Sequence, residues 1–178
     1  MALHQRRKSS IEKTAIEMLN EHDLLAPGFD IEILIKQLGI RLIEEKLDEN
    51  ISGYSAIKNN VRVIAVNEGH GNERKRFTMA HELGHLTLHN FSEFNFSEHQ
   101  RTFFRNNVSS SGLDNFEVEA NCFAASLLMP KDLILREFNE SGTSFLFDEA
   151  EITNLSSRFK VSEKAMAIRL TTLGLINL

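Results

Sequence analysis

The chain has 178 residues, of which 42% are hydrophobic and 25% are charged, a composition typical of a globular protein with a sizeable core rather than of a disordered chain. The net charge of −5 argues against nucleic acid as the main partner, because phosphate binding needs a concentrated basic surface. The single cysteine, Cys122, suits a reducing compartment, and neither a secretory signal nor an apolar run of roughly eighteen residues is present. We therefore expect a soluble, cytoplasmic protein without a membrane span.

Helices are predicted in the first forty residues. Apolar residues at helical spacing indicate a helix over 9–22, with a serine at position 9 or 10 as its N-cap. The basic cluster at 6–8 is interpreted as a solvated terminus, with a nucleic-acid-binding arm as the alternative. Asp30 is expected to cap a second helix, which stops at Gly39.

Strands are predicted next, because the hydrophobic period changes after Gly39. Residues 40–47 indicate a first strand, and the β-rich runs 52–58 and 61–66 flank a two-residue Asn59-Asn60 turn, which is typical of a hairpin. We therefore expect a small antiparallel sheet ahead of a helix that begins near Asn72 or Glu73.

That helix carries an H-E-x-x-H motif at residues 81–85. Residues four apart lie one turn apart on the same face, so His81 and His85 can direct their imidazoles at one point. Glu82 can reach a water on a metal without being a ligand itself. The apolar flanks indicate a buried helix, in which such polar residues need partners, so the motif predicts a zinc hydrolase site over an exposed polar stripe.

A second carboxylate-bearing helix is predicted from Asp114 to its end before Pro130. Catalytic zinc commonly takes three protein ligands, so the third is expected from Glu117 or Glu119 at the head of this helix; spacing alone does not choose between them. The phenylalanine-rich residues 90–114 between the two helices are interpreted as a loop with a short helix at about 98–106. Packing beneath this loop is favoured over a substrate groove.

Helices are predicted for the rest of the chain, at 131–138, 149–159 and 162–173. The last two surround a short turn, with Ser162 as an N-cap, and resemble either a helix-turn-helix DNA reader or a helical packing module. The segment is not especially basic, which favours packing.

Three stretches together are similar to the ImmA/IrrE family of metallopeptidases: I-S-G-Y-S-A before V-R-V-I-A-V-N, then R-F-T-M-A-H-E-L-G-H-L-T-L-H, then E-V-E-A-N-C-F-A-A-S-L-L-M-P. The resemblance covers most of the chain from about Asp30 onward, including the C-terminal helices. It implies an α+β fold: a zincin-like core with a small antiparallel sheet packed on the H-E-x-x-H helix, plus C-terminal helices. We expect a metallopeptidase domain over 1–130 and a helical subdomain over 131–178.

The resemblance also implies a function and a ligand set. One zinc ion per chain is expected on His81, His85 and Glu119, with Glu117 as the second choice and Glu82 as the catalytic base. The implied reaction is hydrolysis of a peptide bond in a protein substrate, typically a helix-turn-helix repressor. Nucleic acid is not an expected partner, and the oligomeric state stays open.

Other polar residues near the motifs receive structural interpretations. His89 lies roughly 12 Å of helix rise from His81, so it is interpreted as a neighbour of the site or a partner of the helix C-terminus rather than a ligand. His70 and Tyr54 are candidates for stabilising a transition state, but loop exposure and sheet packing are the favoured interpretations. Cys122 is interpreted as a small buried residue.

Two functions from other classes remain as alternatives. The first is a metal-containing regulatory or binding module that is catalytically silent. The second is a DNA-binding regulator that reads DNA through its C-terminal helices, which the negative net charge disfavours.

Overall fold

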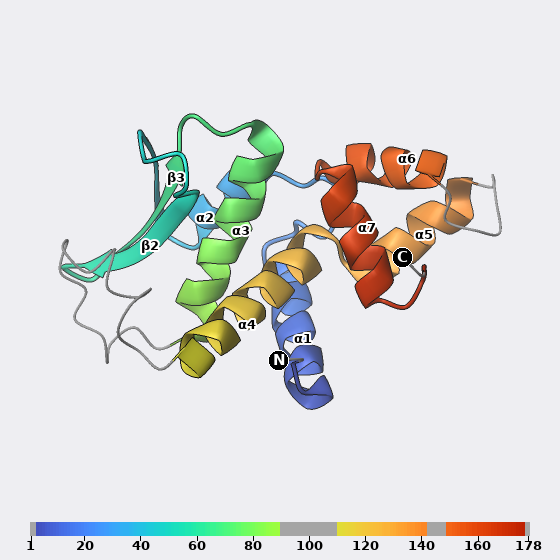
Figure 1. Ribbon diagram of the computed structural model, residues 1–178, viewed down its shortest axis with the longest axis horizontal. Helices are drawn as coiled ribbons and strands as arrows, with labels where there is room; N and C mark the ends of the chain where they lie inside the picture. Colours follow the sequence, from blue (N-terminus) through green and yellow to red (C-terminus); the bar gives the residue numbers. More distant parts are fainter. Residues whose placement is uncertain (1–2, 90–109, 142–148, 177–178) are drawn as a thin grey trace.

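The computed structural model describes residues 3–89, 110–141 and 149–176. In these ranges the chain forms seven helices and three strands, which confirms the expected α+β class. Figure 1 shows the sheet on one side of α3, α4 and α1 on its other side, and α5–α7 at the opposite end of the molecule from the sheet. The elements are α1 (Gln5–Glu21), α2 (Ile31–Gln37), β1 (Arg41–Glu45), β2 (Gly53–Lys58), β3 (Val61–Asn67), α3 (Asn72–Leu88), α4 (Ser110–Leu128), α5 (Lys131–Ser141), α6 (Glu149–Phe159) and α7 (Glu163–Thr172).

The first helix begins earlier than the apolar periodicity predicts. His4, and not a serine at position 9 or 10, is the N-cap, and its side chain accepts a hydrogen bond from the backbone N–H of Arg6. The basic cluster therefore lies inside α1. Two of its members have partners on other helices: Arg7 donates to Glu119, and Lys8 donates to the carbonyl of Thr172. The interpretation as a solvated terminus was wrong for these two residues, because each side chain bonds to a residue far away in the sequence.

The sheet has three strands in the order β1-β3-β2. The predicted hairpin is confirmed: β2 and β3 pair antiparallel, and both Asn59 (φ 52°) and Asn60 (φ 63°) have the positive φ that a type I′ turn requires. β1, however, pairs parallel with β3, so the sheet is mixed and the expectation of a wholly antiparallel sheet was wrong. The reason lies in the strand order: β2 forms one edge of the sheet, and β3 lies between β2 and β1. The middle strand β3 runs opposite to β2 and in the same direction as β1.

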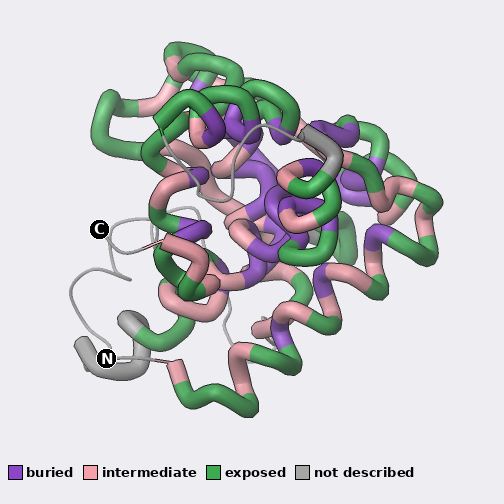
Figure 2. The backbone as a smooth tube through the Cα atoms, turned by 90° about the vertical axis from the view of Figure 1, so that its right-hand side faces the viewer, coloured by how far each residue is buried: buried purple, intermediate pink, exposed green. Residues whose placement is uncertain are grey.

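The core lies where α3 is enclosed between the sheet and α4 (Figure 1). Figure 2 shows the buried segments gathered in the interior of the molecule. Ile64 and Val66 of β3 are buried on one side of this layer, and Phe123 and Leu127 of α4 are buried on the other. Gly84 allows close contact between the two helices, because a Cβ there would lie 3.2 Å from the Ala120 carbonyl oxygen. The H-E-x-x-H helix is thus held on two sides, which fixes the direction of its polar face.

α6 and α7 follow the predicted boundaries, whereas α5 ends at Ser141, three residues later than predicted. Ser162 caps α7 through a hydrogen bond from Ala165 N–H. Their buried residues Leu155, Phe159 and Met166 belong to the same hydrophobic cluster as the core of the first part. The domain boundary at residue 130 stays a prediction, and this shared cluster crosses it. Of the loop predicted over 90–114, residues 90–109, with the short helix expected at about 98–106, lie outside the described residues. Its last part was wrong, because α4 begins at Ser110, four residues before the predicted start at Asp114.

No helix in the described parts of the chain is both long enough and apolar enough to cross a membrane.

Candidate metal centre

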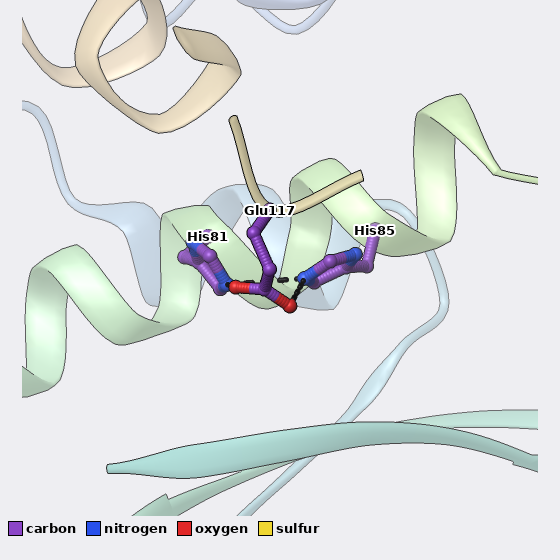
Figure 3. Close-up of side chains that lie close together, drawn as sticks. All are labelled: His81, His85 and Glu117. Carbon is purple, nitrogen blue, oxygen red and sulfur yellow. Dashed lines mark hydrogen bonds and ion pairs between the residues drawn. The ribbon is translucent and has the colours of Figure 1, made fainter. Parts of the chain in front are cut away.

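Two histidines of α3 and one glutamate of α4 converge on a single point (Figure 3). The Nε2 atoms of His81 and His85 lie 3.0 Å apart. The carboxylate of Glu117 lies between the rings, with Oε2 3.2 Å from His81 Nε2 and Oε1 3.3 Å from His85 Nε2. The i, i+4 spacing in α3 and the packing of α4 against α3 place these three ligand-type atoms together.

The other ring nitrogen of each histidine has its own partner. His81 Nδ1 lies 3.1 Å from Oδ1 of Asn121, and His85 Nδ1 lies 3.1 Å from Nδ1 of His89. An amide oxygen only accepts, so the neutral ring of His81 carries its proton on Nδ1 and has an unprotonated Nε2. The contact with Asn121 therefore presents the lone pair of His81 to the point of convergence.

These donor atoms fit a zinc ion. Neutral imidazole nitrogens and a carboxylate form a common catalytic ligand set for zinc. Zinc–nitrogen bonds of about 2.0 Å at tetrahedral angles separate two nitrogens by about 3.3 Å. Hydrogen-bond acceptors that converge at 3.0–3.3 Å in a partly buried site repel one another unless a cation or a proton lies between them. Without a metal, a proton shared between His81 and Glu117 would have this role.

The pKa of His81 is raised. Burial alone lowers it, but the hydrogen bond with Glu117 and the charges of Glu82 and Glu117 outweigh burial. The pKa of Glu117 is lowered well below its usual range, first by its contact with His81 and then by its contact with His85. Both shifts favour an ionised Glu117 beside a protonated His81. A bound cation would take the place of that proton.

Glu82 lies next to this centre, with a partner on the sheet. Its Oε2 accepts a hydrogen bond of 2.8 Å from the hydroxyl of Ser55 on β2. Burial raises the pKa of Glu82, while the charges of His81 and His85 and the bond from Ser55 lower it in part. A carboxylate whose pKa is raised toward neutrality is suited to taking and returning a proton.

Glu119 lies away from the two convergent histidines. Its carboxylate accepts a 2.7 Å hydrogen bond from Arg7 Nε and a second bond from Arg7 Nη2. Its Oε2 also lies 3.4 Å from His89 Nε2. The bond with Arg7 is the main reason that the pKa of Glu119 is lowered. Of the two carboxylates that the sequence left open, the structure brings Glu117, and not Glu119, to His81 and His85.

The helical stripes of α4 account for this difference. Glu117 shares a face with Ala120 and Ala124, two fully buried alanines of α4. Glu119 shares a different face with Cys122 and Ser126, and α1 packs against α4. Ala120 lies opposite Gly84 of α3, so a small residue on each helix marks the contact face. Sequence reasoning did not use this signal.

The remaining candidates lie apart from the centre or beside it. The hydroxyl of Tyr54 donates to Glu45, because side chains alternate along β2 and Ser55 takes the face toward Glu82. His89 contacts His85, which agrees with its interpretation as a neighbour of the site. Cys122 is partly buried, and burial raises the pKa of its thiol. Sequence reasoning did not single out Ser55, Asn121 or Arg7.

Comparisons with known proteins show the family to which the chain belongs. Residues 35–171, most of the chain, match the IrrE N-terminal-like domain family, peptidase family M78, and the chain belongs to that family. This membership supports a metallopeptidase-like or regulatory role, and it confirms the resemblance seen in the sequence.

Two individual proteins are similar to the chain. The uncharacterized immunity region protein 2 of Bacillus phage phi105 is 27% identical over 154 residues, which cover 86% of this chain and 89% of the phage protein. A solved structure described as a Mycobacterium tuberculosis transcriptional regulator superposes with a TM-score of 0.63 at 18% identity. That match covers 92% of this chain but 46% of the other, so the chain spans about half of that regulator's length and shares its fold.

Proposed function

We propose that the chain is a cytoplasmic zinc-dependent metalloendopeptidase that cleaves a protein substrate. His81, His85 and Glu117 would hold one zinc ion, and Glu82 would be the catalytic base. The observation that carries the proposal is the convergence of three ligand-type atoms, all within 4.8 Å of one another, beside a carboxylate of raised pKa.

Bound zinc would supply two effects: a lower pKa for a water molecule and polarisation of the scissile carbonyl. Glu82 would accept a proton at Oε1, since Ser55 holds Oε2, and return it to the leaving amine. Ser55 fixes the carboxylate by a single short contact from the edge strand. Asn121 keeps His81 in the tautomer that a metal requires.

The position of β2 supports an extended peptide as the substrate. In the described parts of the chain, β2 pairs only with β3, so no described strand occupies its outer edge, where an extended peptide would add as a further strand. Ser55 lies on this strand and contacts Glu82, so a peptide added along the edge would run beside the catalytic base.

The proposed substrate is a helix-turn-helix transcriptional repressor, so that cleavage would derepress genes. The names of the two similar proteins support this choice by analogy, because one belongs to a phage immunity region and the other is a transcriptional regulator. The coordination chemistry itself is independent of the substrate.

Metal content tests the site. We would measure zinc by mass spectrometry on wild-type protein and on Glu117→Gln, Glu119→Gln and Glu82→Gln variants. About one zinc per chain in wild type, its loss in Glu117→Gln and its retention in Glu82→Gln are expected. Glu119→Gln should still bind zinc when zinc is supplied, although more weakly than wild type. No zinc in wild-type protein, even after zinc is supplied, would overturn the proposal.

Cleavage tests the activity. Zinc-loaded wild-type protein and Glu82→Gln would each be incubated with helix-turn-helix repressors from the same genome, and products would be identified by mass spectrometry. Cleavage by wild type alone is expected. A zinc-loaded wild type that cleaves none of them, and that instead binds a repressor intact, would establish a silent regulatory module; a salt-dependent DNA shift would establish a DNA-binding one.

A further inference from the structure

A chain of polar contacts runs from α1 to the metal-facing histidine His85. Arg7 of α1 donates to the carboxylate of Glu119 on α4 through both Nε and Nη2. Glu119 Oε2 lies 3.4 Å from Nε2 of His89, the residue that ends α3. His89 Nδ1 then lies 3.1 Å from His85 Nδ1. Four residues from three elements thus lie in series.

The chemistry of each group fixes where the protons lie. A carboxylate held by a guanidinium is ionised and only accepts, so His89 carries its proton on Nε2 and donates it to Glu119. Neutral His89 then has an unprotonated Nδ1, which accepts from His85. His85 therefore carries its proton on Nδ1, and its Nε2, which faces Glu117, keeps a free lone pair.

His81 reaches the same tautomer with one contact, to Asn121. The tautomer of His85 depends on more than its contact with His89, because the ring of His89 can itself donate or accept at either nitrogen. Glu119 is needed to fix the donor nitrogen of His89, and the guanidinium of Arg7 is needed to hold Glu119. Without Glu119 the ring of His89 has no fixed direction of donation. Without Arg7 the carboxylate of Glu119 loses the two bonds that orient it.

We propose that Arg7, Glu119 and His89 are positioning residues that fix the tautomer and ring orientation of His85 and thereby set how tightly the site holds its metal. This inference rests on the proposed function, since it concerns the same metal centre. It also makes α1 part of the site. Arg7 lies outside residues 35–171, the part of the chain that matches the family, so the family match does not predict its role.

The geometry explains why the residue at position 7 is an arginine. Its planar fork engages both oxygens of Glu119, one through Nε and the other through Nη2. A lysine ammonium is a single point charge and cannot make this paired contact. Lysine at position 7 is therefore expected to restore the charge but not the orientation.

Zinc affinity and zinc dissociation rate, measured by competition with a chromophoric chelator, provide the first test. Contacts that orient a ligating histidine typically change metal affinity by about 10–100-fold, and we expect a loss of that order for His89→Ala and Glu119→Gln. Arg7→Gln is expected to lose several-fold, and Arg7→Lys only part of that. Arg6→Gln, which changes an exposed arginine next along the same helix, is the matched control and should bind like wild type.

A double-mutant cycle distinguishes an effect of Arg7 that is transmitted through His89 from independent effects of the two residues on zinc affinity. If Arg7 acts through His89, Arg7→Gln should have no further effect on zinc affinity in a His89→Ala background. Additive effects would overturn the inference. So would wild-type affinity in folded His89→Ala and Arg7→Gln variants, with folding checked by thermal melting. Complete loss of zinc in Glu119→Gln would instead make Glu119 a ligand and would also overturn it.

The imidazole ¹⁵N chemical shifts of the metal-free protein provide a readout that needs no zinc. At a pH where both rings are neutral, His85 is expected to be protonated at Nδ1 and His89 at Nε2 in wild type, with mixed tautomers in Arg7→Gln. The opposite tautomers would overturn the inference. If wild-type protein shows the expected tautomers but binds no zinc, the proposed function fails and the positioning chain stands.

Discussion

Ser55 on the edge strand β2 donates a 2.8 Å hydrogen bond to Glu82, the carboxylate of the H-E-x-x-H motif on α3. The strand can approach the helix this closely because Gly53, two residues earlier, has no side chain. A Cβ at position 53 would overlap the carbonyl oxygen of Ala65 and the methyl group of Thr78. The sheet therefore holds the proposed catalytic base through the same strand whose outer edge is proposed for the substrate.

Replacing Ser55 with alanine is expected to shift the pH dependence of cleavage. The hydroxyl favours the ionised form of Glu82, so its loss raises the pKa of a carboxylate that burial already raises. The base works only when ionised, so the rising limb of kcat/KM against pH should move to higher pH. At neutral pH we expect a loss of roughly tenfold, as is typical for a hydrogen bond to a charged group.

The control for this prediction is Ser52→Ala. Ser52 precedes the same strand, but its hydroxyl accepts from Arg74 rather than contacting Glu82. Its pH profile should coincide with that of wild type. An unshifted profile in Ser55→Ala would show that the hydroxyl does not influence the base.

The local features of the fold were predictable because short-range chemistry determines them. Asn59 and Asn60 tolerate the positive φ of the hairpin turn, and Asp30 and Ser162 cap helices with their own side chains. His81 and His85 follow from helical spacing alone. Each of these features depends on residues within a few positions of one another.

The third carboxylate was not predictable in the same way. The choice between Glu117 and Glu119 depends on how α4 is rotated about its axis, and its packing against both α3 and α1 sets that rotation. The partner of Glu119 is Arg7, which lies 112 residues away in the sequence. Periodicity in one helix contains no information about such a partner.

Gly84→Ala is expected to destabilise the protein and weaken metal binding. The added Cβ would lie 3.1 Å from Phe123 and 3.2 Å from the Ala120 carbonyl oxygen, so α4 must move away from α3. Alanine gains about 1 kcal/mol in helix propensity, but overpacking against backbone costs typically 1–3 kcal/mol. We expect a net loss of about 1 kcal/mol in urea unfolding, and weaker zinc binding because Glu117 moves with α4.

Gly69→Ala is the control for this substitution. Gly69 is exposed, and the nearest atom to an added Cβ there lies 3.4 Å away. If Gly84→Ala were as stable as wild type and bound zinc equally well, the spacing of α3 and α4 would not matter for the site.

Arg169→Met is expected to loosen α7 from the rest of the protein. Arg169 is 3% exposed; its Nε donates to the Met129 carbonyl at 3.1 Å, and its Nη1 lies 3.4 Å from Glu12. Methionine keeps most of the apolar stem but leaves the carbonyl without this donor. Glu12 is partly exposed and can be hydrated, so we expect a loss of about 2 kcal/mol rather than the larger cost of a fully buried orphan charge.

Urea unfolding measures this loss, and hydrogen exchange locates it. Faster exchange should be concentrated in α7. Lys164→Met removes an exposed cation from the same helix and should leave both measurements unchanged. Equal unfolding midpoints for Arg169→Met and wild type would contradict the prediction.

Arg7→Gln is expected to reduce the sensitivity of the metal-free protein to acid. The pKa of Glu119 is lowered in the folded state, mainly by Arg7, so the unfolded chain binds a proton at higher pH than the folded chain does. The stabilisation by Glu119 is therefore complete above the unfolded pKa of about 4.3 and is lost as pH falls through the folded value. The Arg7 side chain is 42% exposed, so solvent screening limits the contribution to about 1 kcal/mol at pH 7.

Urea unfolding in the presence of a chelator measures this contribution. Arg7→Gln should be less stable than wild type at pH 7, and the two stability curves should converge toward pH 3. Arg6→Gln should follow wild type throughout. A constant difference between Arg7→Gln and wild type across this range would mean that Arg7 stabilises the fold without acting on the ionisation of Glu119.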